Sequence, residues 1–176
     1  MRARHKIFAG LGAGLAVLTG LVVGLDAADR AFPPPLERAV VVSAEVLDAD
    51  GALLRAFATQ EGRWRLRTTI GDVDRRFLAM LVAYEDKRFF EHGGVDPFAV
   101  ARAFLQLVVN GQVVSGASTL TMQVARLIEP RETRSLSAKL LQAVRAVQIE
   151  RRLTKQEILE LYLTHAPYGG NLEGVR

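Results

Sequence analysis

Two adjacent acidic residues, Glu85 and Asp86, are the strongest candidates for chemistry in this sequence. They end an apolar helical pattern, and basic residues, an aromatic pair and His92 follow within residues 85–96. A carboxyl group at such a junction can lie half in the core, where desolvation raises its pKa towards the value that a general base needs. The alternative is a solvated helix end with an ordinary salt bridge. Residues 85–96 taken alone favour that alternative.

A loop that contains Gly116 and the helix expected after it form a second candidate, an anion site. Ser118 is expected to cap a helix that runs from Thr119 to about Ile128. A helix N-terminus offers unpaired N–H groups and a favourable dipole to an anion. The helix would carry three polar side chains on one face: Thr119, Gln123 and Arg126. That face could hold a sugar and a phosphate, and plain capping beside a solvated stripe is the equal alternative.

A third polar stripe follows on the next expected helix. Its members recur at three-residue steps: Lys139, Gln142, Arg145 and Gln148. Most stripes of this kind are solvated faces of a helix.

Composition favours anionic partners and argues against nucleic-acid binding and metal sites. The chain has 176 residues, enough for one domain, and 49% of them are hydrophobic. Its net charge of +4 suits anionic surfaces such as lipid headgroups or pyrophosphates, whereas the scattered basic residues argue against nucleic acid. There is no cysteine, and His5, His92 and His165 are far apart, so no metal site is expected and His92 alone reads as structural.

The remaining pattern predicts a mostly α-helical bundle with a small β element. Residues 40–47 and 52–58 flank an Asp-Gly turn and predict a hairpin, and residues 60–69 read as a loop. Five helices are expected, beginning in turn at Asp72 or Asp74, at Asp96-Pro97, after Ser118, at Ser135 or Ser137, and at a Thr154–Glu157 capping box.

The N-terminus carries the pattern of a membrane anchor. Three basic residues within residues 1–6 precede residues 7–25, an uncharged apolar run that would span roughly 28 Å as a helix. The positive-inside rule then places residues 1–6 in the cytoplasm and the chain after Asp29 outside. A cleaved signal peptide is the competing interpretation. Prolines within residues 31–37 predict a stiff spacer, and residues 26–70 a linker with the hairpin.

Together these clusters resemble the motifs of one family. Residues 85–96 resemble the first motif of the glycosyltransferase domain of class A penicillin-binding proteins (glycosyltransferase family 51), and residues 116–126 resemble the second. Lys139 with its neighbours is similar to the third motif, and residues 155–164 are similar to the fourth.

Within that family the sequence is most similar to the 1C branch, through residues 122–126 and 166–170. The resemblance spans roughly residues 40–176, and the family's domain continues further, so residues 71–176 are expected to be a domain truncated at its C-terminus. The third motif departs from the usual pattern, with Ala138 before Lys139 and Gln142 where a glutamate is common.

The resemblance implies an enzyme that polymerises lipid II into glycan strands with inversion at the anomeric carbon. Glu85 matches the family's catalytic glutamate, which takes the proton of the attacking sugar hydroxyl, and Asp86 would support the site. Undecaprenyl pyrophosphate would leave. The positions matching the family's substrate-binding residues are Ser118, Thr119, Gln123, Arg126, Lys139 and Gln142.

The resemblance also implies a mainly α, lysozyme-like fold with a membrane-embedded jaw, for which residues 98–109 are the candidate. It implies no organic cofactor and allows a divalent cation, Mg²⁺ or Mn²⁺. Expected partners are lipid II, the growing strand, the membrane and other cell-wall synthesis proteins, with the catalytic part outside the cytoplasmic membrane. A lytic glycosidase and a non-catalytic scaffold of the wall-building machinery are the alternatives.

Overall fold

The computed structural model describes residues 19–20, 22–24, 26–27, 29–110, 117–130 and 135–176. The chain divides into two compact units, Met1–Pro34 and Pro35–Arg176. Within the described residues, no helix is both long enough and apolar enough to cross a membrane. The predicted tail, residues 1–6, and most of the predicted anchor, residues 7–25, lie outside the described residues.

The second unit is mainly helical, and the five expected helices are confirmed. They are α2 (Arg75–Glu85), α3 (Pro97–Asn110), α4 (Leu120–Ile128), α5 (Leu136–Glu150) and α6 (Lys155–His165). Three short 3₁₀ turns accompany them: η1 (Leu36–Val40), η2 (Ile70–Asp72) and η3 (Phe89–Glu91).

Helix caps decide between the alternatives that the sequence left open. Asp74 caps α2 by accepting the N–H of Arg76 at 2.7 Å, and Ser135 caps α5 in the same way. The expected capping box at Thr154 and Glu157 begins α6.

The expected cap of α4 is wrong by one residue. Thr119, not Ser118, is the N-cap: its backbone is extended, and its hydroxyl accepts the N–H of Met122 at 3.1 Å. Capping requires a side-chain oxygen on the last residue before the helix, and here the helix begins at Leu120.

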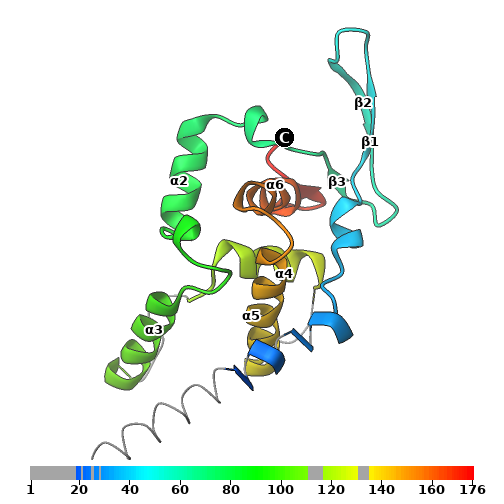
Figure 1. Cartoon of the computed structure of the whole chain (residues 1–176). Helices are drawn as coiled ribbons and strands as arrows, with labels where there is room; N and C mark the ends of the chain where they lie inside the picture. The colour runs from blue at the N-terminus through cyan, green and yellow to red at the C-terminus, as the bar shows by residue number, and fades with distance from the viewer. Residues whose placement is uncertain (1–18, 21, 25, 28, 111–116, 131–134) are drawn as a thin grey trace, which may run out of the picture. The chain divides into compact units, whose positions relative to one another are not determined.

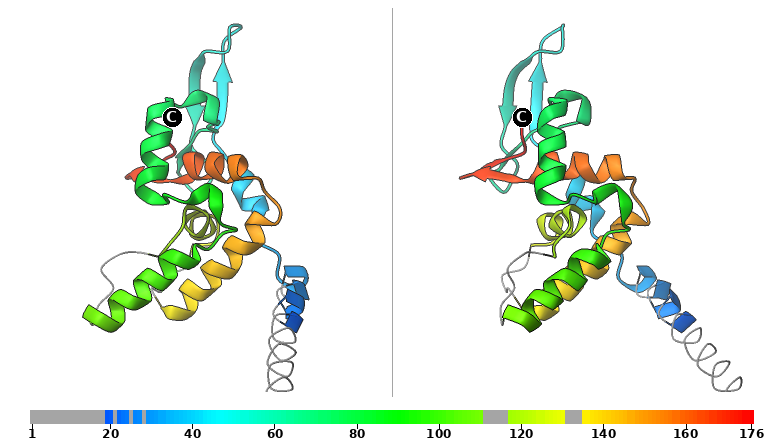
Figure 2. Two further views of the ribbon diagram at one scale, coloured as in Figure 1. Left: turned by 60° about the vertical axis from the view of Figure 1, so that its left-hand side comes forward. Right: turned by 90° about the vertical axis from the view of Figure 1, so that its left-hand side faces the viewer.

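The predicted hairpin is confirmed with shorter strands. β1 (Ala44–Leu47) and β2 (Leu53–Phe57) pair antiparallel, and the Asp48 carboxylate accepts two N–H groups within the turn. Figures 1 and 2 show this hairpin extending away from the helices.

The predicted loop at residues 60–69 is wrong in part. It contains β3 (Trp64–Arg65), which pairs parallel to β5 (Leu172–Glu173), and β4 (Pro167–Gly169) pairs with β5 on the other side. An ion pair of 2.6 Å between Arg65 and Glu173 joins β3 to β5. The partner strand lies at the far end of the chain, so no local pattern could reveal this pairing.

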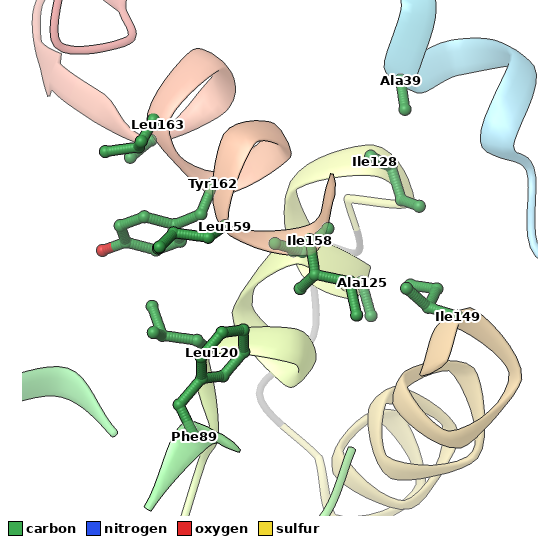
Figure 3. Packing of buried hydrophobic residues seen from close by; sticks show 12 residues of the cluster. Ala39, Phe89, Leu120, Ala125, Ile128, Ile149, Ile158, Leu159, Tyr162 and Leu163 are labelled. Atoms are coloured by element: carbon green, nitrogen blue, oxygen red, sulfur yellow. The ribbon is translucent and has the colours of Figure 1, made fainter. Parts of the chain in front are cut away.

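Helix α4 lies at the centre of the helical packing. It contacts both α5 and α6, between which Figure 1 shows it. Figure 3 shows the core around it, where Phe89 lies beside Leu120, and where Ile158 of α6 and Ile149 of α5 lie near Ala125 of α4. Phe89, Leu120 and Ile158 are fully buried. Because Phe89 follows α2 closely, its burial in the core fixes the chain just beyond Glu85.

Helix α3 packs little of its apolar surface. Among its residues only Ala99 and Ala103 are buried. Its large apolar side chains are exposed: Phe98, Val100, Phe104, Leu105, Leu107, Val108 and Val109. An apolar patch of this extent is unusual for a surface in contact with water alone.

One glycine permits the loop after η3 to pack against α5. Gly94 has φ +96°, and a Cβ there would lie 2.7 Å from the carbonyl carbon and oxygen of Ala146. Gly94→Ala should therefore lower the free energy of unfolding by roughly 2–4 kcal/mol, through backbone strain and overpacking. Gly93 is the matched control, because it lacks a positive φ and a Cβ would meet nothing within 4 Å.

Denaturant unfolding of both variants checks this expectation. Gly93→Ala should stay within about 0.5 kcal/mol of wild type. Equal stabilities for the two variants would contradict the close approach of Gly94 to α5.

Candidate functional site

The carboxylate of Glu85 faces the centre of α4. Glu85 is the last residue of α2, and its Oε2 accepts a hydrogen bond of 2.8 Å from the Nε2 of Gln123. Both residues are partly buried. The structure thus brings together two residues from the first and second motifs, and the hydrogen bond orients a carboxylate that solvent still reaches.

Asp86 is buried, and its carboxylate is used within the protein. One oxygen accepts the backbone N–H of Leu120 at 3.0 Å, in the first turn of α4. The other lies 3.0 Å from Nε2 of His92. The side chains of Asp86 and His92 are each only 4% exposed. Asp86 therefore joins the end of α2 to the start of α4, where helix N–H groups would otherwise lack partners.

Thr119 and Gly94 link the start of α4 to the loop that follows α2. The Thr119 hydroxyl donates a 2.6 Å hydrogen bond to the Gly94 carbonyl while it accepts the N–H of Met122. Thr119 is 2% exposed. Its hydroxyl is thus occupied in fixing the loop against α4.

Asp96 anchors the far end of the loop. Its carboxylate caps α3 through the N–H groups of Phe98 and Ala99 and pairs with Arg88. Burial alone would raise the pKa of Asp96, but the hydrogen bonds from Arg88, Ala99 and Phe98 together hold that pKa below its usual value. The Arg88 guanidinium also lies 4.1 Å from the Phe98 ring centroid.

Tyr162 of α6 adds a polar group that the motif analysis did not single out as functional. Burial raises the pKa of Tyr162 to about 12, with smaller contributions from Glu85 and Tyr168 and an opposing one from Arg126. Figure 3 shows the Tyr162 hydroxyl pointing away from the core. The sequence placed Tyr162 within the fourth motif, residues 155–164, without giving it a role.

The expected basic residues lie on neighbouring helices. Arg126 on α4 and Lys139 on α5 are exposed, and neither side chain makes a hydrogen bond or ion pair within the described parts of the chain. Gln142 lines a small cavity between the two helices with Ala125 and Arg145. Glu85 and Arg126 act in opposite directions on the pKa of Tyr162, but no described contact joins Arg126 or Lys139 to Glu85.

Ser118 and the third polar stripe take different places. Ser118 is half-buried just before the cap and makes no hydrogen bond among the described residues. Gly116, the glycine of the predicted anion loop, lies outside them. Of the predicted stripe, Arg145 forms a 2.8 Å ion pair with Glu129 and Gln148 is buried, so this half of the stripe is structural rather than solvated.

The residues do not by themselves form a metal site. No group of three or more His, Asp or Glu side chains within the described ranges is arranged to hold an ion. Glu85 has an amide as its neighbour, and both oxygens of Asp86 are already hydrogen-bonded.

Comparison with known proteins places these motifs in a family context. The profile described as Transglycosylase matches residues 50–176. Penicillin-binding protein 1C of Escherichia coli is 48% identical over 148 residues, which cover 84% of this chain and 19% of that protein. Penicillin-binding protein 1A of Haemophilus influenzae is 40% identical over 131 residues, covering 74% of this chain and 15% of that protein.

A third relative, penicillin-binding protein 1A of Aquifex aeolicus, is 34% identical over 168 residues, covering 94% of this chain and 23% of that protein. The chain thus spans about a fifth of the length of the curated relatives it matches.

The buried Asp86 carboxylate generates a stability prediction. Asp86→Ala leaves the Leu120 N–H and the His92 ring without their partner, which should lower the free energy of unfolding by roughly 2–5 kcal/mol. The exposed neighbour Lys87 provides the control, and Lys87→Ala should change stability by no more than about 0.5 kcal/mol. Denaturant unfolding measures both, and an Asp86→Ala variant as stable as Lys87→Ala would contradict the anchoring role.

Proposed function

The chain belongs to the transglycosylase family, the glycosyltransferase domain of class A penicillin-binding proteins, and on that premise we propose that it polymerises lipid II into the glycan strands of peptidoglycan. The observation that carries the proposal is the Glu85 carboxylate, fixed at the end of α2 by Gln123 and by the buried Asp86 beside it. Family membership supports lipid II as the substrate, and this geometry supports the Glu85 carboxylate as the reacting group.

In the proposed reaction Glu85 acts as the general base. It takes the proton from the 4-hydroxyl of the acceptor sugar while that oxygen forms a bond to the anomeric carbon of the growing strand. The bond from that carbon to the pyrophosphate breaks, and its electron pair leaves with undecaprenyl pyrophosphate. Attack opposite the leaving group inverts the anomeric centre. Asp86 supports the reaction by holding Glu85 in place, since its own carboxylate is enclosed.

The proposed donor site lies along α4 and α5. A departing pyrophosphate develops negative charge, which preorganised cations stabilise. Arg126 and Lys139 are exposed cations without a partner among the described residues, so both are available to an anion. Ser118, Gln123 and Gln142 would contact the sugar or phosphate, whereas Thr119 would contribute by fixing the loop.

We further propose that the protein works at a membrane surface. Residues 7–25 would anchor it, with residues 1–6 in the cytoplasm and the catalytic part outside. Like α3, helix α5 carries exposed apolar side chains, since Leu136 and Leu140 are 84% and 69% exposed. A lipid-linked substrate is best reached from a face that enters the bilayer, and these residues offer such a face.

The direct test compares products made by wild type and Glu85→Gln. Purified wild-type protein in detergent with lipid II should give strands longer than the substrate, as read by gel electrophoresis. Glu85→Gln keeps the size of the side chain and a hydrogen-bonding oxygen for Gln123 but removes the base, so polymerisation should fall by roughly a hundredfold or more. Its thermal unfolding should stay close to that of wild type.

Other outcomes identify other functions. Shorter fragments released from intact cell wall would point to a lytic glycosidase. Near-normal polymerisation by Glu85→Gln would contradict the assignment of the base, and a folded wild type without activity on either substrate would favour a scaffold.

The proposed anion site makes a separate prediction. Arg126→Ala and Lys139→Ala should each lower polymerisation by roughly tenfold or more, because a charge-assisted contact to phosphate contributes about 1.5–3 kcal/mol. Melting temperature should change little, since both side chains are solvated without ligand. The exposed Arg75 provides a control, as Arg75→Ala removes a cation at the end of α2 opposite to Glu85. Activities within about twofold of wild type for both variants would leave them as ordinary surface residues.

A further inference from the structure

Lys155, the first residue of α6, meets three other segments at one point. Its ammonium donates to the backbone carbonyl of His92 at 2.6 Å and to the Glu150 carboxylate of α5 at 2.7 Å. It also lies 4.5 Å from the ring centroid of Phe89, which is fully buried. The acceptors and the aromatic face surround a group with only three donors. Lys155 is therefore held from several sides.

The partner carboxylate is itself fixed. Glu150 is 9% exposed, and its Oε1 also accepts a 2.6 Å hydrogen bond from the Thr121 hydroxyl of α4. A partly buried ion pair gains little net stability over an apolar pair of the same size, so stability alone gives a weak reason for it. This pair does fix the relative positions of several segments, because it ties α4, α5 and α6 to the loop that follows Glu85.

The path from Lys155 to the reacting carboxylate is short. Lys155 holds the carbonyl of His92, and the ring of the same residue contacts the Asp86 carboxylate. Asp86 accepts the Leu120 N–H and directly follows Glu85 in the chain. The loop between α2 and α3 is thus fixed at its start by Asp86, and near its middle by the bond from Lys155 to His92. Loss of the hydrogen bond from Lys155 would leave the backbone of His92 unheld, and with it the ring that contacts Asp86.

We infer that Lys155 is a positioning residue for the reaction, which it serves by holding the loop that sets the Glu85 carboxylate. This inference rests on the proposed function. We assign Lys155 no contact with the substrate, since its ammonium is occupied by His92, Glu150 and Phe89. Its removal should therefore slow the chemical step and leave the affinity for lipid II unchanged.

The test must separate positioning from folding. Lys155→Met leaves Glu150 buried without its cation, so both turnover and melting temperature should fall. In the double variant Glu150→Gln/Lys155→Met, both charges are gone and the introduced amide keeps an oxygen for Thr121, so most of the melting temperature should return. Turnover should not return: kcat should stay lower by roughly tenfold to a hundredfold, with KM for lipid II within about twofold of wild type.

Arg151 provides the matched control. It is exposed at the end of α5 and its side chain has no hydrogen bond or ion pair within the described ranges, so Arg151→Met should keep kcat, KM and melting temperature. If the double variant does not fold, Lys155→Arg replaces it. A guanidinium keeps the charge beside Glu150 but cannot occupy the ammonium's place between carbonyl and ring, so kcat should again fall alone.

The outcomes are distinguishable. Wild-type kcat in the folded double variant, or in Lys155→Arg where that is used, overturns the inference and leaves the proposed function standing. A wild-type protein that fails to polymerise lipid II overturns the proposed function and this inference with it.

Discussion

The buried carboxylate of Asp86 is the constraint on which the rest of the site depends. A charged group that is 4% exposed must be hydrogen-bonded, and Asp86 finds its partners at the start of α4 and in the His92 ring. Both partners come from segments that follow α2 in the chain, and the carboxylate holds them against its end. The cost of leaving this carboxylate unpaired therefore fixes where α2 ends, where α4 begins and where Glu85 points.

Packing around that carboxylate explains why the loop between α2 and α3 has the residues it has. Phe89 fills the core beside Leu120, so the chain must turn inward three residues after Asp86. Gly94 must then pass the backbone of α5 at a distance that leaves no space for a Cβ. Asp96 ends the loop by capping α3. A motif of twelve residues thus combines one proposed reacting group with many residues that only position it.

The sequence predicted the helices well because their caps and periodicity are local. Asp74, Ser135 and Thr154 each form a cap with the backbone a few residues later, and that relation is visible in the chain. It did not predict β3, whose partner β5 lies more than a hundred residues away. The Ser118 cap was wrong by one residue because two adjacent hydroxyl residues satisfy the same local rule.

For the site, the sequence could identify Glu85, Gln123 and Arg126 only through motif resemblance, since periodicity alone allowed a solvated helix end. It could not assign Lys155, Glu150 or Tyr162, which look like ordinary cap and core positions until α4, α5 and α6 are packed together. Their roles arise from contacts between segments distant in sequence.

Amide hydrogen exchange at Leu120 tests the central constraint most directly. The first N–H of a helix normally lacks a protein acceptor and exchanges quickly, whereas the Leu120 N–H donates to a buried carboxylate. The account predicts that Leu120 exchanges as slowly as the buried helical amide of Val124 within α4. A Leu120 amide that exchanges at the rate of an exposed helix terminus would show that Asp86 does not hold α2 and α4 together.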